Sequence, residues 1–185
     1  PGMSAGRRLM FVVNNPAFFM SHRVPVALAA QRAGYDVHVA TMDGPAVADI
    51  QALGMTHHAI PMTRSGKHPL QELGTLLALV RLFRRVRPDV VHLVTIKPVL
   101  YGGIAARLAR VRGMVAAISG LGFVFLSNSL KMRLVRSVVA RLYRIALGHP
   151  NSRVIFQNAN DRDLLKSLGA VRDAQVVMIR GAGVD

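Results

Sequence analysis

Short apolar runs alternate with longer helical patterns along the chain, and this alternation limits the fold more than any single residue does. Runs such as VVHLVT and QVVMI are apolar on both faces, as in a parallel sheet covered by helices on both sides. Strand–helix alternation with short loops predicts a doubly wound, Rossmann-like α/β domain, whose ligands bind at the carboxyl ends of the strands. The expected strands are 8–14, 36–41, 56–60, 89–95, 114–119, 153–157 and 175–179. The expected helices are 21–33, 45–53, 69–87, 99–112, 128–147 and 159–168.

The charge balance is strongly basic, with 24 Lys and Arg against 9 Asp and Glu and a formal net charge of +15 in 185 residues. Such a chain is attracted to anionic partners, namely nucleic acid, acidic lipid or phosphorylated ligands. Nucleic acid is disfavoured, because no reader motif is present and the few aromatic residues lie in apolar context. Glu72 is the only glutamate, so chemistry that rests on a pair of glutamates cannot be housed in this chain alone.

Several other classes of site are excluded or not expected. The chain has no cysteine, which rules out disulfides and thiol chemistry. His57, His58 and His68 lack metal-ligand spacing with carboxylate partners, so no metal site is expected. No apolar run has the length that spans a bilayer, and the first apolar run does not resemble a secretory signal. Residues 1–7 are interpreted as an expression tag or a disordered N-terminus ahead of one domain over 8–180.

The turn after the first strand carries polar residues where a dinucleotide site would have glycines. Ser21 is expected to be the N-cap of the helix that follows, and the free N–H groups there favour an anion, with His22 and Arg23 as additional donors. Asn14 and Asn15 either form a simple Asx turn or contribute to such a site. No G-x-G-x-x-G follows the strand, so a dinucleotide site is not expected.

Two later turns leave strands near the expected centre of the sheet. Lys97, with Pro98 as the first helical residue, is either a cation pointing into the ligand crevice or a surface lysine. Ser119 and Gly120 form either a flexible loop with free N–H groups, suited to a phosphate or a sugar hydroxyl, or an ordinary tight turn. His92 lies mid-strand in an apolar run and is expected to be a core histidine with satisfied hydrogen bonds.

The expected helix 128–147 is strongly amphipathic, with arginines on one arc and apolar side chains on the opposite arc. The cationic arc suits an anionic membrane surface. The alternative is that the apolar arc packs into the core and the basic face is merely solvated. The arginines are Arg133, Arg136, Arg141 and Arg144. The apolar residues are Leu134, Val135, Val138, Val139, Leu142, Ile145 and Ala146.

Five stretches together resemble, in the same order, the N-terminal half of bacterial family 4 glycosyltransferases that build O-antigens, capsules and lipid-linked glycans. They are NNPAFFMSHRVPVALAAQRAGYDVHVAT, VHLVTIKPVLYGGIAAR, ISGLGFVF, FQNANDRDLL and IRGAGVD. The resemblance covers nearly the whole chain. It implies a GT-B fold, in which two Rossmann-like domains face each other across a cleft. The N-terminal domain binds the acceptor, and the C-terminal domain binds the nucleotide-sugar with a glutamate-containing motif.

The resemblance therefore implies an acceptor-binding domain that is inactive alone and holds no cofactor of its own. Residues 181–185 would begin the linker to the donor domain. Many relatives carry a histidine, often proposed to be catalytic, where this chain has Ser119 and Gly120, so that role is not transferred and no catalytic residue is assigned. Two alternatives remain: half of a GT-B UDP-N-acetylglucosamine 2-epimerase, or a non-catalytic, membrane-recruiting subunit of a split glycosyltransferase.

The resemblance also suggests what the first turn binds. The segment from Asn14 to His22 would face the interdomain cleft and suit a sugar on a polyprenyl diphosphate. The enzyme would then be cytoplasmic and peripheral on the inner membrane, with the basic helix as its docking surface.

Overall fold

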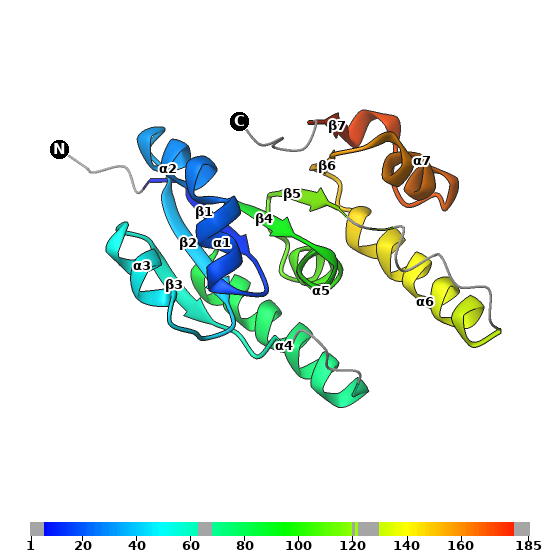
Figure 1. Ribbon diagram of the computed structural model, residues 1–185, viewed down its shortest axis with the longest axis horizontal. Coiled ribbons are helices and arrows are strands. Elements are labelled where there is room, and N and C mark those ends of the chain that lie inside the picture. Colours follow the sequence, from blue (N-terminus) through cyan, green and yellow to red (C-terminus); the bar gives the residue numbers. More distant parts are fainter. Residues whose placement is uncertain (1–5, 63–67, 120, 122–129, 180–185) are drawn as a thin grey trace.

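A computed structural model describes residues 6–62, 68–119, 121 and 130–179. The strands are β1 (Arg8–Val12), β2 (Asp36–Thr41), β3 (Thr56–Ala59), β4 (Val90–Val94), β5 (Gly113–Ile118), β6 (Ser152–Phe156) and β7 (Val176–Met178). The helices are α1 (Pro16–His22), α2 (Val24–Arg32), α3 (Val47–Ala52), α4 (Pro69–Val86), α5 (Ile96–Leu108), α6 (Leu130–Leu147) and α7 (Ala159–Ser167), with a 3₁₀ turn at Asp173–Gln175. The strands form one parallel sheet in the order β3-β2-β1-β4-β5-β6-β7 (Figure 1), which confirms the predicted Rossmann-like class.

The direction of winding reverses between β1 and β4, which lie side by side at the centre of the sheet. The chain first proceeds from β1 outward to β3, and α4 then carries it back to β4 on the other side of β1. Strands β5 to β7 extend the sheet from there. Because the loops that leave β1 and β4 diverge to opposite sides, the carboxyl edge at this switch point is where a ligand crevice is expected.

Side chains that alternate along the strands supply two hydrophobic layers. On β1, Phe11 and Val13 pack with α1 to α3, in a cluster that includes Phe19 of α1. Met10 and Val12 face the other way, into a larger cluster built with α4 to α7. Both faces of the central strands are therefore covered, which explains why β1 and β4 are almost wholly apolar.

The second half of the sheet is covered differently. Among the described residues, the cluster on the α1–α3 side extends no further than β4 and includes no residue of β5, β6 or β7. Val115, Ile155 and Val177 alternate with residues of the larger cluster, so they face this open side. They are only half-buried, and Ile179 beyond β7 is 52% exposed. Helices thus cover both faces of the sheet as expected, but over β5–β7 the described helices lie on one face alone.

Helix α5 packs against its neighbours at glycines. A Cβ atom at Gly102 would lie 2.6 Å from Cδ2 of Leu93 on β4. A Cβ atom at Gly103 would lie 2.7 Å from both the Cβ and the carbonyl oxygen of Ala146 on α6. Both distances are shorter than a carbon–carbon or carbon–oxygen contact allows. The two glycines therefore let α5 approach the sheet on one side and α6 on the other.

Several element boundaries differ from those expected. The single helix predicted over 21–33 is two helices, α1 and α2, that meet at Arg23. The N-cap of α7 is Asn158, whose Oδ1 accepts a hydrogen bond from the Asp161 N–H at 2.8 Å. Gly169 has φ +69° just past the end of α7.

No helix in the described parts of the chain has the length and apolar character needed to cross a bilayer. The predicted linker, 181–185, and most of the predicted N-terminal segment, 1–5, lie outside the described residues.

Candidate functional site

In the first turn at the carboxyl edge, the residue that caps a helix is Asn15 rather than Ser21. Asn15 is the N-cap of α1, and its Oδ1 accepts a hydrogen bond from the Ala17 N–H at 2.8 Å. Ser21 lies at the end of that helix, where its hydroxyl donates to the Phe18 carbonyl at 3.1 Å. The prediction that Ser21 caps the following helix is therefore wrong, and α2 begins without a side-chain cap. Helix α2 follows α1 directly, the Arg23 N–H already donates to the Phe19 carbonyl, and Pro25 in its first turn has no N–H.

His22 and Arg23 stand at the junction of α1 and α2. The His22 ring stacks on Phe18 with centroids 4.1 Å apart, and its Nδ1 lies 2.6 Å from the Ser21 hydroxyl oxygen. This stacking fixes the exposed imidazole at the sheet edge. Arg23 is half-buried, and burial lowers the pKa of its guanidinium, although an arginine in this range stays charged. The junction thus presents one fixed imidazole and one fixed cation.

Lys97 has a different environment from the one expected. It lies in the first turn of α5, which begins at Ile96, so Pro98 is the third helical residue rather than the first. The Lys97 ammonium pairs with Glu72 of α4 at 3.0 Å. Glu72 also helps raise the pKa of the Tyr101 hydroxyl, after burial, which is the largest cause. Lys97 and Glu72 therefore join α4 to α5, and Lys97 is not among the residues that line the cavity described next.

A cavity of about 390 Å³ lies at the carboxyl edge beside the switch point. It brings together two of the predicted site residues, His22 and Ser119, with Arg23 and with His92 from β4. Its remaining wall is mostly apolar, and consists of Pro25, Val26, Ala117, Ile118, Ile155, Gln157 and Ile179. Of the other predicted residues, Asn14, Asn15, Ser21 and Lys97 do not line it, and Gly120 lies outside the described residues.

Buried polar atoms without partners gather near this edge. In the described part of the chain, Asn14 Oδ1, Arg23 Nε, His92 Nε2 and Thr95 Oγ1 are shielded from solvent and make no hydrogen bond. The expectation that His92 is a satisfied core histidine is therefore wrong at its Nε2 atom. Thr95 also has φ +71° and ψ 176°, a conformation that costs about 1–3 kcal/mol for a residue with a side chain. Unpaired buried groups and a strained residue together mark this edge as a candidate ligand-binding site.

His92 is held neutral by its surroundings. Its ring stacks on Phe11 at 4.9 Å between centroids, and 8% of the residue is exposed. Burial, and to a smaller extent the charge of Arg23, lowers the pKa of His92 to about 3. A group with so low a pKa is a poor general base near neutral pH. At neutral pH the ring can position a bound group by donating or accepting one hydrogen bond.

This environment makes stability depend on pH in a defined direction. The unfolded chain binds a proton at His92 below its ordinary pKa, whereas the folded chain does not until pH falls to about 3. Stability from this residue is thus complete above pH 6.5 and is lost as pH falls. Between pH 7.5 and 4.5 the loss should be about 2–3 kcal/mol. His92→Gln should remove that component, so denaturant unfolding curves of the two proteins should converge as pH falls.

A control separates this component from general acid effects. His68 precedes α4 and is exposed, so the His68→Gln variant should follow the pH dependence of the unchanged protein. If His92→Gln also runs parallel to the unchanged protein across this range, the buried-imidazole explanation is wrong.

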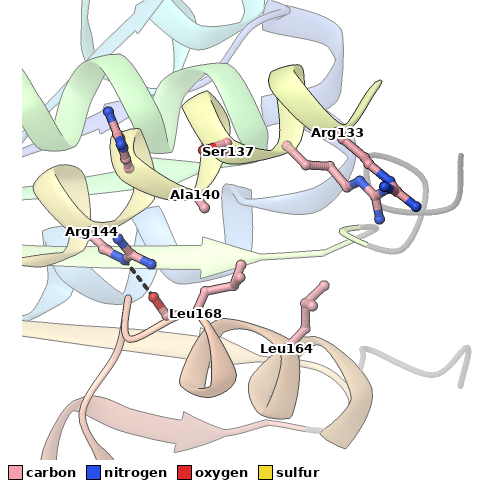
Figure 2. Close-up of a pocket in the computed structure, with 8 residues that line it drawn as sticks. Arg133, Ser137, Ala140, Arg144, Leu164 and Leu168 are labelled. Carbon is pink, nitrogen blue, oxygen red and sulfur yellow. Dashed lines mark hydrogen bonds between the residues drawn. The ribbon is translucent and has the colours of Figure 1, made fainter. Parts of the chain in front are cut away.

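The four predicted arginines of α6 line a second hollow, which we call the arginine groove. Figure 2 shows Arg133 and Arg144 on α6 opposite Leu164 and Leu168 on α7. Arg136, Ser137, Ala140 and Arg141 complete the lining, and the groove has a volume of about 580 Å³. Arg144 Nε donates to the Leu168 carbonyl at 2.6 Å, so this arginine also holds the end of α7. The arginines that were predicted to share one arc of α6 therefore line a groove between α6 and α7.

The apolar arc of α6 is only partly in the core. Ala146 is buried, and Val139 and Leu142 pack against the larger cluster. Leu134 and Val138, in contrast, are 69% and 50% exposed, and Val135 and Ile145 are exposed as well. The apolar arc is thus only partly packed in the core, and the solvent-facing side of α6 carries apolar residues as well as arginines. A helix surface of that composition is typical of segments that lie on a membrane.

No group of three or more His, Cys, Asp or Glu within the described ranges is arranged to hold a metal ion.

Comparison with known proteins assigns the family. The model of the family described as "Glycosyl transferase 4-like" matches residues 8–158, which include strands β1 to β6 and the polar residues of the cavity. The chain belongs to this family. A curated relative from Campylobacter jejuni, N,N'-diacetylbacillosaminyl-diphospho-undecaprenol alpha-1,3-N-acetylgalactosaminyltransferase, is 21% identical over 178 residues.

Solved structures show the same fold. A glycosyltransferase from Rickettsia africae matches 94% of this chain with a TM-score of 0.63 at 14% identity, over 42% of its own chain. Acinetobacter baumannii MurG matches 97% with a TM-score of 0.59 at 14% identity, over 46% of its chain. A UDP-GlcNAc 2-epimerase from Neisseria meningitidis, bound to UDP-GlcNAc, matches 92% with a TM-score of 0.63 at 12% identity, over 46% of its chain.

The matches cover nearly all of this chain but less than half of each related protein. The chain aligns over 96% of its own length but spans only 47% of the Campylobacter relative. It therefore corresponds to about half of such a protein, as the resemblance implied.

Proposed function

We propose that this chain is the acceptor-binding half of a glycosyltransferase that moves a sugar from a nucleotide-sugar to a lipid-linked or polysaccharide acceptor in surface glycan synthesis. The observation that carries the proposal is the cavity of His22, Arg23, His92 and Ser119 at the carboxyl edge of a family 4 sheet. The named acceptor of the Campylobacter relative is a sugar on diphospho-undecaprenol, which supports the lipid-linked class.

The charged side chains around the cavity suit the binding of an acceptor better than the binding of a nucleotide-sugar donor. Glu72, the only glutamate, is paired with Lys97 and does not line the cavity, and no carboxylate is among the described residues that do. A nucleotide-sugar site that uses a glutamate motif would therefore come from a second domain. The half described here would supply cations and hydrogen-bond donors for an acceptor that carries negative charge.

We also propose that α6 docks the protein on the cytoplasmic face of the inner membrane. Exposed Leu134 and Val138 beside Arg133 and Arg141 support this, because cations attract anionic lipid while apolar side chains enter the interface. A lipid-linked acceptor lies in that membrane, so docking would bring the cavity to its substrate. The other partners would be the acceptor lipid and a donor domain.

The reaction can be tested directly. The reading frame of this chain, expressed with the coding sequence that follows it, should transfer labelled sugar from a UDP-sugar to a sugar-diphospho-undecaprenol. His22→Gln should lower the rate at least tenfold, since the fixed imidazole lines the cavity, while Arg32→Gln on the exposed end of α2 should not. Release of a free epimerised sugar without labelled lipid would instead favour the epimerase alternative. The absence of any activity without a separate catalytic chain would favour the recruiting subunit.

A further inference from the structure

The carboxyl-edge cavity has two chemically different ends. One end is the α1–α2 junction, where Arg23 and His22 supply side-chain donors and the N-terminus of α2 is the positive end of its helix dipole. The other end is apolar and includes Val26, Ile155 and Ile179. A ligand that fills both ends must therefore carry an anionic group joined directly to hydrocarbon.

The apolar end opens onto the side of β5–β7 that no described helix covers. Figure 1 shows α1 to α3 grouped over the β1–β3 half of the molecule, whereas β5 to β7 extend away from them. Ile155 and Val177 are half-buried on this open side, and Ile179 is 52% exposed. Covering an apolar sheet surface of this kind with hydrocarbon is thermodynamically favourable.

The polar end argues against a purely apolar occupant. His92 Nε2 and Arg23 Nε are both shielded and have no hydrogen-bond partner among the described residues. His92 is buried, with 8% of the residue exposed, so its unmet hydrogen bond is costly unless a ligand or water supplies one. A helix packed across the cavity would leave both atoms unpaired, whereas a phosphate oxygen can accept from a guanidinium and from an imidazole N–H.

We propose that this cavity is the subsite for the diphosphate and the first isoprene units of a lipid-linked acceptor. Arg23 and the N-terminus of α2 bind the diphosphate, His92 donates to one of its oxygens, and the open face of β5–β7 receives the hydrocarbon. The inference rests on the proposed function, since it names the part of the acceptor that this site holds. It also gives each end of the cavity a separate role.

Three soluble probes separate those roles in calorimetric titrations of the 185-residue chain. Farnesyl diphosphate carries both features, inorganic pyrophosphate only the charge, and farnesol only the hydrocarbon. Farnesyl diphosphate is expected to bind at least tenfold more tightly than either of the others. Equal affinity for pyrophosphate and farnesyl diphosphate would overturn the role of the open sheet face.

Variants locate the binding. Arg23→Gln should weaken both diphosphates at least tenfold, while the neutral change Ile179→Asn, at an exposed position, should weaken farnesyl diphosphate and leave pyrophosphate unchanged. Arg32→Gln is the charge-matched control on the same helix. Arg141→Gln tests the arginine groove, and a loss of binding there but not at Arg23 would overturn the proposal. Circular dichroism confirms that each variant is folded.

A spectroscopic readout distinguishes a direct contact from a structural effect. A diphosphate beside His92 should raise the pKa of its imidazole from about 3, since a nearby anion favours the charged ring. The ¹⁵N shifts of His92 should therefore change on addition of farnesyl diphosphate and not in Arg23→Gln. Unchanged His92 signals at saturating ligand would overturn its assigned role.

Failure of this inference and failure of the proposed function give different results. Transfer to diphospho-undecaprenol acceptors without Arg23-dependent binding of farnesyl diphosphate leaves the function and removes the subsite. Arg23-dependent binding without any transfer leaves the subsite and removes the function. If the longer protein fails to bind farnesyl diphosphate when the 185-residue chain does, a protein segment occupies the open face and the proposal is wrong.

Discussion

Gly103→Val is expected to destabilise the protein by about 3 kcal/mol or more, because the new side chain has no room between α5 and α6. Even the first added carbon would lie 2.7 Å from the carbonyl oxygen of Ala146, and backbone cannot move aside as a flexible side chain does. The clash would force α6 away from α5 and disturb the arginine groove with it. Denaturant unfolding followed by circular dichroism measures the change.

Gly74→Ala is the matched control. Gly74 is an exposed residue inside α4, and an added Cβ atom there meets nothing within 4 Å. Alanine should therefore raise stability by about 0.5–1 kcal/mol, since glycine costs about that much in a helix interior. If both variants change stability by the same small amount, close packing at Gly103 is not what determines the position of α6.

Arg133→Gln with Arg141→Gln is expected to weaken binding to anionic vesicles by about 2 kcal/mol, or roughly thirtyfold, at low salt. Both arginines are exposed on α6. Arg144 is left in place because its bond to Leu168 holds α7, so its loss could act through the fold. Co-sedimentation with vesicles of acidic lipid measures binding, which should fade as salt rises and be weak with neutral lipid.

The charge-matched control is Arg84→Gln with Arg110→Gln. These exposed arginines line a separate hollow, together with Arg87, Asp89 and Arg112. Removing them also takes away two positive charges, so overall charge is the same in both double variants. If the control weakens vesicle binding as much as the α6 variant, net charge rather than α6 is responsible.

The sequence predicts the fold well because each strand is a run of apolar residues of the right length. It identifies all seven strands and the central position of 89–95, and the structure confirms both. The start of the first helix is predicted wrongly, because Ser21 resembles a helix cap and the start signal at Asn15-Pro16 is overlooked. That pair is itself a start signal, since an Asn cap followed by proline begins many helices.

The candidate site is harder to predict from sequence. Lys97 could not be excluded from the crevice, because its partner Glu72 lies 25 positions away on another helix. His92 looks like any histidine in an apolar strand, and only the structure shows that its Nε2 lacks a partner. The open face of β5–β7 is equally hidden. A strand has the same apolar residues whether a helix of its own chain or something else covers it.

Because β1 pairs with β4, the centre of the sheet cannot form until β4 has been synthesised. The Arg8 N–H donates to an Asp89 carboxylate oxygen, so the centre of the sheet joins residues 81 positions apart. A ribosome that adds roughly 5–20 residues per second needs several seconds to deliver β4 after β1. During that time β1 can pair with β2 on one edge, while its other edge, which later pairs with β4, stays open. Sheets closed by such distant contacts fold slowly, so the nascent chain would depend on chaperones to keep that edge from pairing with other chains.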